Sequence, residues 1–370
     1  MPFLFLIIYL FIKNRNKVAD LNFSTTEIDY AIIVTAYEQT DLLKNVVQSI
    51  LGLNYNNYTI YIVADKCDVT NLHFEDQRVV LLRPEQTLAS NTRSHFYAIN
   101  RFVRPHERLT IIDSDNLVHP EYLNELNKYF NKGYLAVQGL RDAKNLNTIY
   151  ANLDAARDIY YHFYDGEVLF KIGSSATLSG SGMAFTVKLY KDCLAHLDIV
   201  GAGFDKILQK QIVEKKYRIA FAKNAIVYDE KTAQSDQLVK QRARWINTWF
   251  KYFTYGFAFI YKGILHFNWN QFLFGLVLVR PPLFLFIILS LLFFGINIVF
   301  NSLLAIIWAV ALIVFIIGFL SALVINNANS TIYKSLLGIP RFIFFQLVSL
   351  GKVRNANKHS VATKHVINQD

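Results

Sequence analysis

The chain has 370 residues, of which 53% are hydrophobic and 18% are charged, and its mean hydropathy is +0.24. The 30 Phe and 21 Tyr exclude a disordered chain, and so apolar a composition is unusual for a purely soluble domain, so we expect a membrane protein. Two cysteines are too few for a disulfide framework and suit a reducing, cytosolic side. The net charge of +10 suits nucleic acid, anionic lipid or a phosphorylated substrate, and composition alone does not choose among them.

The N-terminal segment 1–17 predicts a short membrane anchor. Its apolar run of about 12 residues would rise about 18 Å as a helix, which is less than the roughly 30 Å hydrocarbon core. A partly inserted anchor and a helix lying in the membrane interface are therefore both open. The segment lacks a basic start and a small-residue cleavage site, so a signal peptide is not expected. Lys13, Arg15 and Lys17 place the segment that follows in the cytoplasm.

Residues 28–245 are predicted to form a cytosolic α/β domain. Short β-branched runs alternate with amphipathic helical runs, which is typical of a mostly parallel sheet covered by helices on both faces. The expected strands are 31–36, 59–64, 79–82, 109–113, 134–138 and 225–228, and the expected helices are 40–51, 120–129, 145–170 and 205–215. Ligands of such sheets bind beyond the carboxyl ends of the strands, so acidic residues at those ends are the candidates.

Two of the predicted strands end in carboxylates. Asp65 follows the strand 59–64, and Asp113 and Asp115 lie at the end of the strand that begins at residue 109. Two carboxylates one residue apart can share a divalent cation and a ribose hydroxyl, and Mg²⁺ and Mn²⁺ keep positions open for substrate phosphates. The pattern therefore favours a site for a sugar–nucleotide diphosphate, whose leaving group the metal neutralises. The alternative is a pair that caps the helix beginning near Pro120.

Two further candidates lie later in the domain. Gly180, Ser181 and Gly182 are small residues that would let the backbone approach a ligand, with a plain tight turn as the alternative. Asp205 opens a predicted helix, a position where Asp usually serves only as a cap.

The last motif, Gln241-Arg242-Ala243-Arg244-Trp245, lies where the α/β domain meets the membrane segments. Gln241 and Arg244 are three residues apart and share a helical face. An arginine can hold a diphosphate and a tryptophan can stack on a sugar ring. The alternative is the end of an interfacial helix with a snorkelling arginine.

The C-terminal third predicts membrane helices. The stretch from 281 to 333 carries no charge and has room for two transmembrane helices within 282–326, placed at 283–300 and 303–325. Basic residues flank this stretch and are missing from the turn at Asn301 and Ser302, so both flanks are expected in the cytoplasm. Residues 246–281 and 332–350 predict aromatic and amphipathic helices in the interface, and 351–370 a basic cytosolic tail.

In this order the motifs resemble membrane-embedded family 2 glycosyltransferases, a group that includes cellulose, chitin, hyaluronan and poly-N-acetylglucosamine synthases and ceramide glucosyltransferase. The family pattern is an Asp, a DxD, a third Asp and QxxRW before transmembrane helices, and the resemblance covers roughly residues 30–350. It implies a cytosolic GT-A (Rossmann-like) domain followed by interfacial and transmembrane helices, in a multi-pass protein of the cell membrane. It also implies inverting, Mg²⁺- or Mn²⁺-dependent transfer of a hexosyl or N-acetylhexosaminyl group from a nucleotide-sugar, by family a UDP-sugar, to a polysaccharide or lipid-linked acceptor.

The resemblance also implies a role for each motif. Asp205 would be the general base, and Asp115 would hold the metal. The nucleotide-sugar would contact Thr35, Tyr37, Glu38, Asp65 and Asp113, and Arg93, or else His95, would replace the family's Gly-Lys at the diphosphate. The residues that contact the acceptor and close the site would be Gly180, Ser181, Gly182, Gln241, Arg244 and Trp245.

Two departures from the family pattern leave an alternative function open. Phe204 stands before Asp205 where the family usually has Glu, and the Gly-Lys is not clearly present. The alternative is a non-catalytic membrane component that binds nucleotide or scaffolds a polysaccharide-synthesis complex. A transporter is disfavoured because the predicted spans hold no ionisable residue, and nucleic acid because the basic excess gathers at the membrane flanks. The sequence predicts two clear transmembrane helices. This number does not decide between synthesis of a polymer and transfer of a single sugar, and an oligomer or an accessory subunit is also open.

Overall fold

The computed structural model describes residues 2–13 and 27–356, which divide into two compact units. The first unit holds residues 27–145 and 175–230 and contains the sheet. The second unit holds residues 2–13, 146–174 and 231–356 and is helical. Residues 1 and 14–17 of the predicted anchor and 357–370 of the predicted tail lie outside the described residues.

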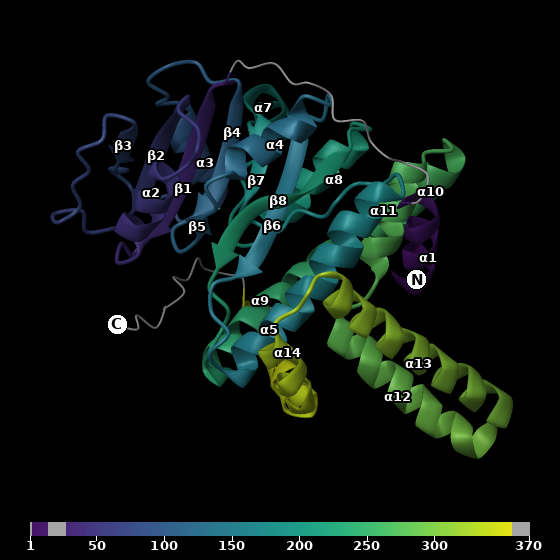
Figure 1. Cartoon of the computed structure of the whole chain (residues 1–370). Coiled ribbons are helices and arrows are strands. Elements are labelled where there is room, and N and C mark those ends of the chain that lie inside the picture. The colour runs from purple at the N-terminus through teal and green to yellow at the C-terminus, as the bar shows by residue number, and fades with distance from the viewer. Residues whose placement is uncertain (1, 14–26, 357–370) are drawn as a thin grey trace. The chain divides into compact units, whose positions relative to one another are not determined.

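Within the described residues, the first unit is built on an eight-stranded sheet in the order β3-β2-β1-β4-β7-β6-β8-β5 (Figure 1). The strands are β1 Tyr30–Tyr37, β2 Tyr58–Asp65, β3 Val79–Leu82, β4 Arg108–Asp113, β5 Leu117–Val118, β6 Ala136–Ala143, β7 Met183–Thr186 and β8 Ile219–Asp229. The pairs β1–β2, β1–β4, β2–β3 and β6–β8 are parallel, whereas β4–β7, β6–β7 and β5–β8 are antiparallel. The α/β prediction is confirmed, and the described sheet is mostly parallel, because all its strands except β5 and β7 run in the same direction.

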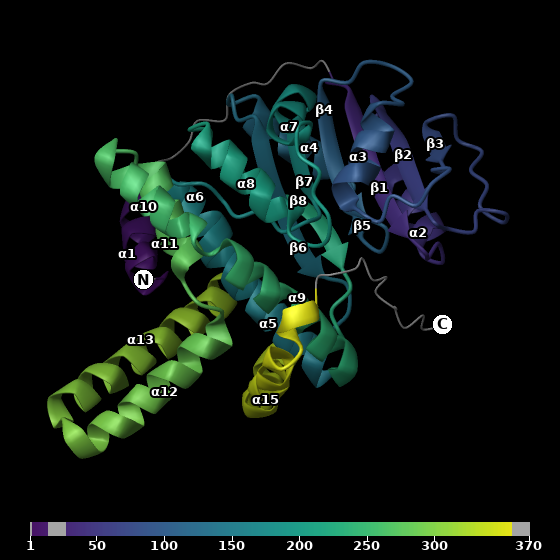
Figure 2. The same ribbon diagram turned by 180° about the vertical axis from the view of Figure 1, so that it is seen from behind.

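Helices cover both faces of this sheet, as Figures 1 and 2 show from opposite sides. They are α2 Leu43–Leu51, α3 Asn91–Ile99, α4 Tyr122–Phe130, α7 Val187–Leu194 and α8 Phe204–Glu214. Tyr30 and Tyr58 are register partners, and their hydroxyls bond to α4 and to the end of α2, so these two helices share a face. Tyr61 points the other way and accepts a hydrogen bond from the amide of Val103, just beyond α3 (2.9 Å). Burial on both faces explains why β1 and β2 are almost continuously apolar.

The second unit is composed of helices. They are α1 Pro2–Lys13, α5 Ile149–Tyr161, a π-helical segment His162–Val168, α6 Leu169–Lys171, α9 Ser235–Tyr252, α10 Tyr255–Leu265, α11 Trp269–Val279, α12 Leu283–Phe300, α13 Ser302–Ile325, α14 Ser330–Ser335 and α15 Ile339–Leu350. The helix predicted over 145–170 is therefore interrupted by the π-helical segment. The predicted amphipathic helix 332–350 is divided between α14 and α15 by a short 3₁₀ turn, Leu336–Gly338.

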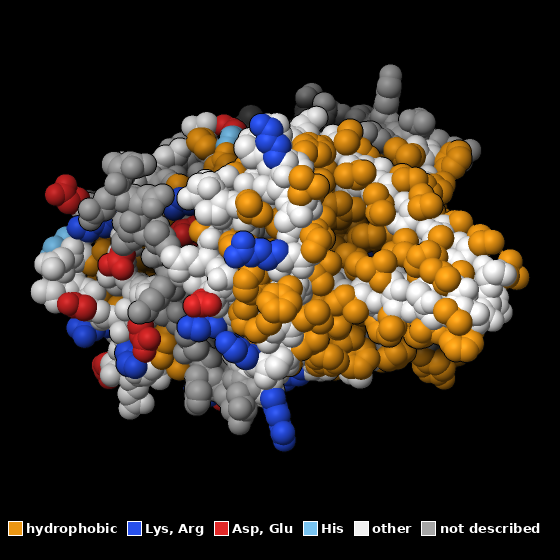
Figure 3. Space-filling view, turned by 90° about the horizontal axis from the view of Figure 1, so that it is seen from below, with side chains coloured by type: hydrophobic (Ala, Val, Ile, Leu, Met, Phe, Trp, Pro, Cys, Tyr) orange, Lys and Arg blue, Asp and Glu red, His pale blue; other side chains and the backbone are white. Residues whose placement is uncertain are grey.

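The helices α12 and α13 lie where the two spans were predicted, and both are long and apolar enough to cross a membrane. That they cross it stays a prediction. Ser302 begins α13 instead of lying in the turn, because the Asn301 side chain accepts a hydrogen bond from the amide of Leu304 (3.1 Å) and caps the helix. Few residues of either helix are buried, and hydrophobic side chains cover the part of Figure 3 where they lie. Broad apolar exposure of this kind is a feature of surfaces that contact lipid or a partner.

Glycines allow α10 and α11 to pack closely. A Cβ built on Gly275 would lie 2.7 Å from the carbonyl oxygen of Gly256, and one built on Gly256 would lie 2.7 Å from that of Gly275. A Cβ on Gly263 would lie 2.5 Å from the amide nitrogen of Phe272. Because backbone atoms cannot move aside as a flexible side chain can, larger residues at these positions would force the two helices apart.

The Gly275→Val variant is therefore expected to lower the free energy of unfolding by about 1–3 kcal/mol through overpacking. The measurement is the Tm of the purified protein in detergent. Gly295→Val on α12 is the matched control, because a Cβ at Gly295 meets nothing within 4 Å. An unchanged Tm for Gly275→Val would contradict the close packing of α10 against α11.

Candidate active site

Parallel pairing brings the predicted nucleotide-binding residues to one edge of the sheet. In the registers of β1 with β4 and with β2, Thr35 is the partner of Asp113 and Tyr37 is the partner of Asp65. The carboxyl ends of three neighbouring strands therefore meet at this edge, where ligands of α/β sheets bind. The nucleotide-binding role predicted for these four residues stays a prediction.

The carboxylates at this edge repel one another. The pKa of the Asp113 carboxyl is raised to about 7, first by burial and second by the negative charge of Asp115. The charges of Asp229 and Asp205 raise this pKa further, and the positive charge of Arg141 opposes them. Asp113, Asp115, Asp205 and Asp229 thus form one electrostatically coupled group, and a cation placed among them would relieve their repulsion.

Asp229, Arg141 and Asn116 belong to this group and were not predicted from the sequence. The Arg141 Nη2 atom lies 2.7 Å from Asp229 Oδ1. The Asn116 Nδ2 atom donates to Asp229 Oδ1 (3.1 Å) and lies 3.2 Å from Asp115 Oδ1, so it ties the two carboxylates together. Asp229 directly follows the predicted strand 225–228, so the rule that selected Asp65 and Asp113 would have found it too.

The Gly180–Gly182 turn is fastened to the end of β4. Its Ser181 hydroxyl accepts a hydrogen bond from the amide of Asp113 (3.0 Å), and the amide of Gly182 donates to the carbonyl of Ile111 (2.9 Å). Gly182 has φ +65°, and a Cβ there would lie 2.8 Å from Val227 Cγ2, so glycine is required on both grounds. The segment is a bend in the backbone that borders the DxD. Its predicted acceptor role stays a prediction.

Asp205 lies in the first turn of α8, which begins after Gly203 in the left-handed conformation (φ +101°). The Asp205 side chain is 15% exposed, and its Oδ2 atom lies 3.0 Å from Lys206 Nζ. Lys206 also donates to the carbonyl of Leu178 (2.8 Å), which fixes its position. The neighbouring Phe204 is buried, and its ring lies 5.2 Å from that of His95, so it belongs to the core.

Of the two candidates for the diphosphate, His95 is ruled out. It is fully buried, its Nδ1 lies 2.7 Å from the Tyr190 hydroxyl, and burial lowers its pKa to about 3, so it is neutral and out of reach of a ligand. Arg93 holds Asp198 with two contacts, from Nε (2.8 Å) and from Nη2 (2.6 Å). Arg93 would have to exchange this carboxylate for a phosphate, and its role stays a prediction.

Asp65 organises the loop that precedes α3. Its Oδ1 accepts a hydrogen bond from the amide of Leu88 (2.9 Å) and its Oδ2 accepts one from the amide of Ala89 (2.7 Å), and the residue is only 2% exposed. Next to it, Lys66 Nζ lies 2.7 Å from Glu38 Oε1 in an exposed ion pair. Asp65 therefore fixes the conformation of the loop that contains Leu88 and Ala89.

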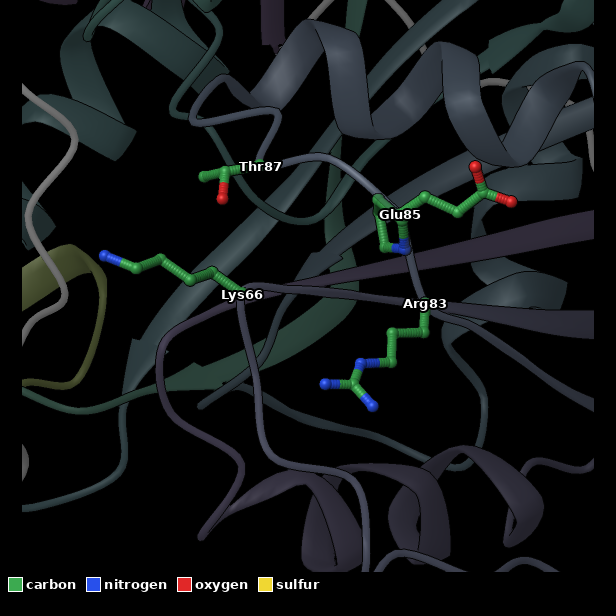
Figure 4. A pocket seen from close by; sticks show the side chains of 5 residues that line it. Lys66, Arg83, Glu85 and Thr87 are labelled. Carbon is green, nitrogen blue, oxygen red and sulfur yellow. The ribbon is translucent and has the colours of Figure 1, made fainter.

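A pocket of about 470 Å³ opens beside this loop, at the carboxyl ends of β2 and β3. It is lined by Lys66, Arg83, Pro84, Glu85 and Thr87, whose side chains Figure 4 shows. Two cationic side chains and hydroxyl and carboxylate groups give it the chemistry to receive a polar, anionic ligand.

The Asp65→Ala variant is expected to weaken donor binding about tenfold or more. The reason is that two backbone amides lose their acceptor, so the loop beside the pocket is no longer held. Leaving a buried donor without an acceptor costs about 1–3 kcal/mol. Isothermal titration calorimetry with UDP and GDP would measure the Kd. Asp68→Ala is the matched control, because Asp68 bonds only locally, to Thr70. Equal affinity in Asp65→Ala and wild type would contradict the role of Asp65 in this loop.

Gln241, Arg244 and Trp245 lie on α9, in the helical unit. Gln241 accepts a hydrogen bond from the Thr232 hydroxyl (3.0 Å), burial lowers the pKa of Arg244, and Trp245 is 37% exposed. The helix confirms the shared face expected of Gln241 and Arg244. Their closing role stays a prediction.

The residues fit a divalent cation that binds together with its substrate. Among residues 2–13 and 27–356, no three His, Cys, Asp or Glu side chains are grouped to hold an ion by themselves. Mg²⁺ usually uses one or two carboxylates and completes its shell with water and substrate phosphates. Asp113 and Asp115 could supply those carboxylates. The pKa of Asp113 is raised first by burial and second by the charge of Asp115, and a cation would offset that charge.

The mixed α/β sheet with helices on both faces is of the GT-A type. The family model "Glycosyltransferase like family 2" matches residues 28–248, more than half of the chain, so the protein belongs to glycosyltransferase family 2. No curated protein matches the sequence significantly.

A solved structure shares this fold. The mannosyltransferase PcManGT from Pyrobaculum calidifontis, in complex with GDP-Man and Mn²⁺, is 14% identical with a TM-score of 0.55, and the match covers 95% of both chains. At this identity the likeness shows the fold alone. S. aureus TarS 1–349 in complex with UDP-GlcNAc matches at 14% identity and a TM-score of 0.39, over 56% of this chain and 60% of that one.

Proposed function

We propose that the protein is an inverting, Mg²⁺- or Mn²⁺-dependent glycosyltransferase that transfers a sugar from a nucleotide-sugar to a polysaccharide or lipid-linked acceptor at the cytoplasmic face of the cell membrane. The observation that carries this proposal is the coupled carboxylate group at the edge of a family 2 domain. A cation bound by Asp113 and Asp115 could also bind the diphosphate of a donor. Asp205 would then remain available as a carboxylate that is not a metal ligand.

The donor that we propose is a UDP-sugar, as in the family that the motifs resemble. The pocket beside Asp65 would receive the nucleoside, with Thr35, Tyr37 and Glu38 along the adjacent strand, and Asp113 would face the ribose and diphosphate. GDP-mannose is the second candidate, because it is the ligand of the similarly folded PcManGT.

Asp205 would act as the general base. Its carboxylate takes the proton of an acceptor hydroxyl, the acceptor oxygen bonds to the anomeric carbon, and the bond from that carbon to the diphosphate breaks on the opposite face. The bonding electrons leave with the nucleoside diphosphate. When bound at Asp115 and Asp113, Mg²⁺ or Mn²⁺ would supply neutralisation of the diphosphate charge. Arg141 and Asn116 hold Asp229 and Asp115 in place for this arrangement.

The membrane placement that we propose rests on α12 and α13 as spanning helices, with basic residues on both cytosolic flanks. Exposed aromatic residues of α10 and α11, including Phe257, Tyr261 and Trp269, suit the headgroup level. Arg244 and Trp245 would close the site over the donor diphosphate and the acceptor. An oligomer or an accessory subunit would be required if the product is a polymer that must cross the membrane.

The test is transfer of radiolabelled sugar by the purified protein in nanodiscs supplied with membrane lipid extract. Label that partitions into organic solvent would identify a lipid acceptor, and label in large water-soluble material would identify a polymer. Label that stays entirely in the donor with every UDP-sugar and GDP-mannose would contradict the proposed function.

A further inference from the structure

The side chain of Trp245 lies against two guanidinium groups. The Cζ atom of Arg157 is 4.1 Å from the centroid of the indole ring, and that of Arg242 is 4.2 Å from it. Both distances are well inside the roughly 6 Å over which a cation is attracted to a ring face, and Trp is the most attractive of the aromatic rings. Arg157 belongs to α5 and Arg242 to α9, so two helices fix the same ring.

Carboxylates hold the two arginines in place. Asp154 Oδ1 pairs with Arg242 Nη2 and lies 3.4 Å from Arg157 Nε. Arg157 also pairs with Asp158, whose other oxygen lies 2.7 Å from Lys231 Nζ. Asp154, Arg242 and Lys231 are each 2% exposed. Because a buried charge that loses its partner is strongly destabilising, this network favours one arrangement of the two guanidinium groups.

The guanidinium group of Arg242 lies near aromatic rings, and two of its nitrogen atoms find no acceptor among the described residues. Its Nε and Nη1 atoms make no hydrogen bond to any described residue. Its Cζ atom lies 5.7 Å from the Phe342 ring in addition to its contact with Trp245. Burial, with the nearby charge of Arg157, lowers the pKa of Arg242 to about 10, so the group is still charged at neutral pH. Buried hydrogen-bond donors usually have acceptors. The distinctive feature of Arg242 is that its guanidinium group lies against aromatic rings instead.

We propose that Arg157 and Arg242 are positioning residues that hold the indole of Trp245 in one orientation, so that its exposed part is presented to the sugar of the acceptor. The inference rests on the proposed function, which gives Trp245 its contact with the acceptor. At 37% exposure, part of the Trp245 side chain is free for a ligand while the rest is packed. Trp249, one turn later, differs: its Nε1 donates to the carbonyl of Arg280 (3.0 Å) and its ring stacks on Phe253.

The test uses the full chain in nanodiscs, labelled with 5-fluorotryptophan and observed by ¹⁹F NMR. The chain has four Trp, and Trp245→Phe assigns the resonance of interest. Arg157 is the residue to change, because its side chain is 16% exposed. Arg242 is 2% exposed, and its loss would remove a buried partner of Asp154 and endanger folding. Arg157→Met removes the charge and Arg157→Lys restores it. Arg341→Met is the control, because Arg341 makes the same kind of contact with the Tyr150 ring (5.6 Å).

Arg157→Met is expected to shift or broaden the Trp245 resonance. It is also expected to raise the apparent KM for acceptor, titrated as membrane lipid extract, about tenfold, which corresponds to the loss of one desolvated cation–π contact. The KM for donor should stay unchanged. Arg157→Lys should recover part of both effects, and Arg341→Met should cause neither.

An unchanged Trp245 resonance in Arg157→Met would overturn the proposal, whatever happens to activity. A shifted resonance with an unchanged acceptor KM would overturn the link from ring orientation to transfer. If the wild-type protein transfers no sugar at all, the proposed function fails, and the resonance still decides whether the two arginines position Trp245.

Discussion

Replacing Asp205 with Asn is expected to lower kcat about 10²- to 10⁴-fold, the range that a positioned general base contributes. The amide is close in shape to the carboxylate but cannot take a proton from the acceptor hydroxyl. Donor affinity should change little, because Asp205 lies at the start of α8, whereas the pocket that we propose for the nucleoside lies at the ends of β2 and β3. Steady-state transfer rates and the Kd for UDP and GDP would separate the two effects.

Asp192→Asn is the matched control for Asp205→Asn. It removes one carboxylate from the same unit, but Asp192 lies on the exposed surface of α7, paired with Lys188 (2.6 Å). It should keep wild-type kcat. A kcat near wild type in Asp205→Asn would show that another group takes the proton, and the assignment of the base would be wrong.

Replacing Asp115 with Ala is expected to lower transfer about a thousandfold or more and to abolish the response to added Mn²⁺ or Mg²⁺. The reason is that a bound metal stabilises the charge on a departing diphosphate by several kcal/mol, and Asp115 is the carboxylate assigned to hold it. Loss of the Asp115 charge also removes one cause of the raised pKa of Asp113. The measurement is kcat/KM over a titration of Mn²⁺.

Asp142→Ala serves as the control for Asp115→Ala, because Asp142 is exposed on β6 and its side chain accepts a hydrogen bond from the amide of the next residue (2.8 Å). Its metal response should equal that of the wild type. If Asp115→Ala instead kept the wild-type dependence on Mn²⁺, the metal would have to bind elsewhere, and the role of the DxD would be lost.

Much of the sheet was predictable, because buried strands are continuous apolar runs whose ends are marked by polar residues. The parallel pairing of β1, β2 and β4 then follows from helical crossovers, and it brings Thr35, Asp65 and Asp113 together. The strands β5 and β7 were missed because runs of two and four residues carry no periodic pattern. The helix α3 was missed because its buried face includes Thr92, Ser94 and His95, which a hydrophobic pattern does not register.

The site was predictable where each residue follows a strand, and unpredictable where a contact joins distant segments. Arg141 lies three residues beyond the predicted end of its strand, because β6 continues to Ala143 in pairing with β8. No local pattern indicates that Arg141 reaches Asp229. The loss of the family's Glu is explained only by packing, since Phe204 contacts His95 in the core.

The central claim is tested most directly by release of nucleoside diphosphate from a panel of UDP-sugars and GDP-mannose. The purified full-length protein in nanodiscs would be assayed with lipid extract and Mn²⁺ or Mg²⁺, beside Asp205→Asn. We predict metal-dependent release with one donor, lost in the variant although the variant still binds that donor. Release that is equal in wild type and Asp205→Asn, or no release with any donor despite binding, would contradict a glycosyltransferase that uses Asp205 as its base.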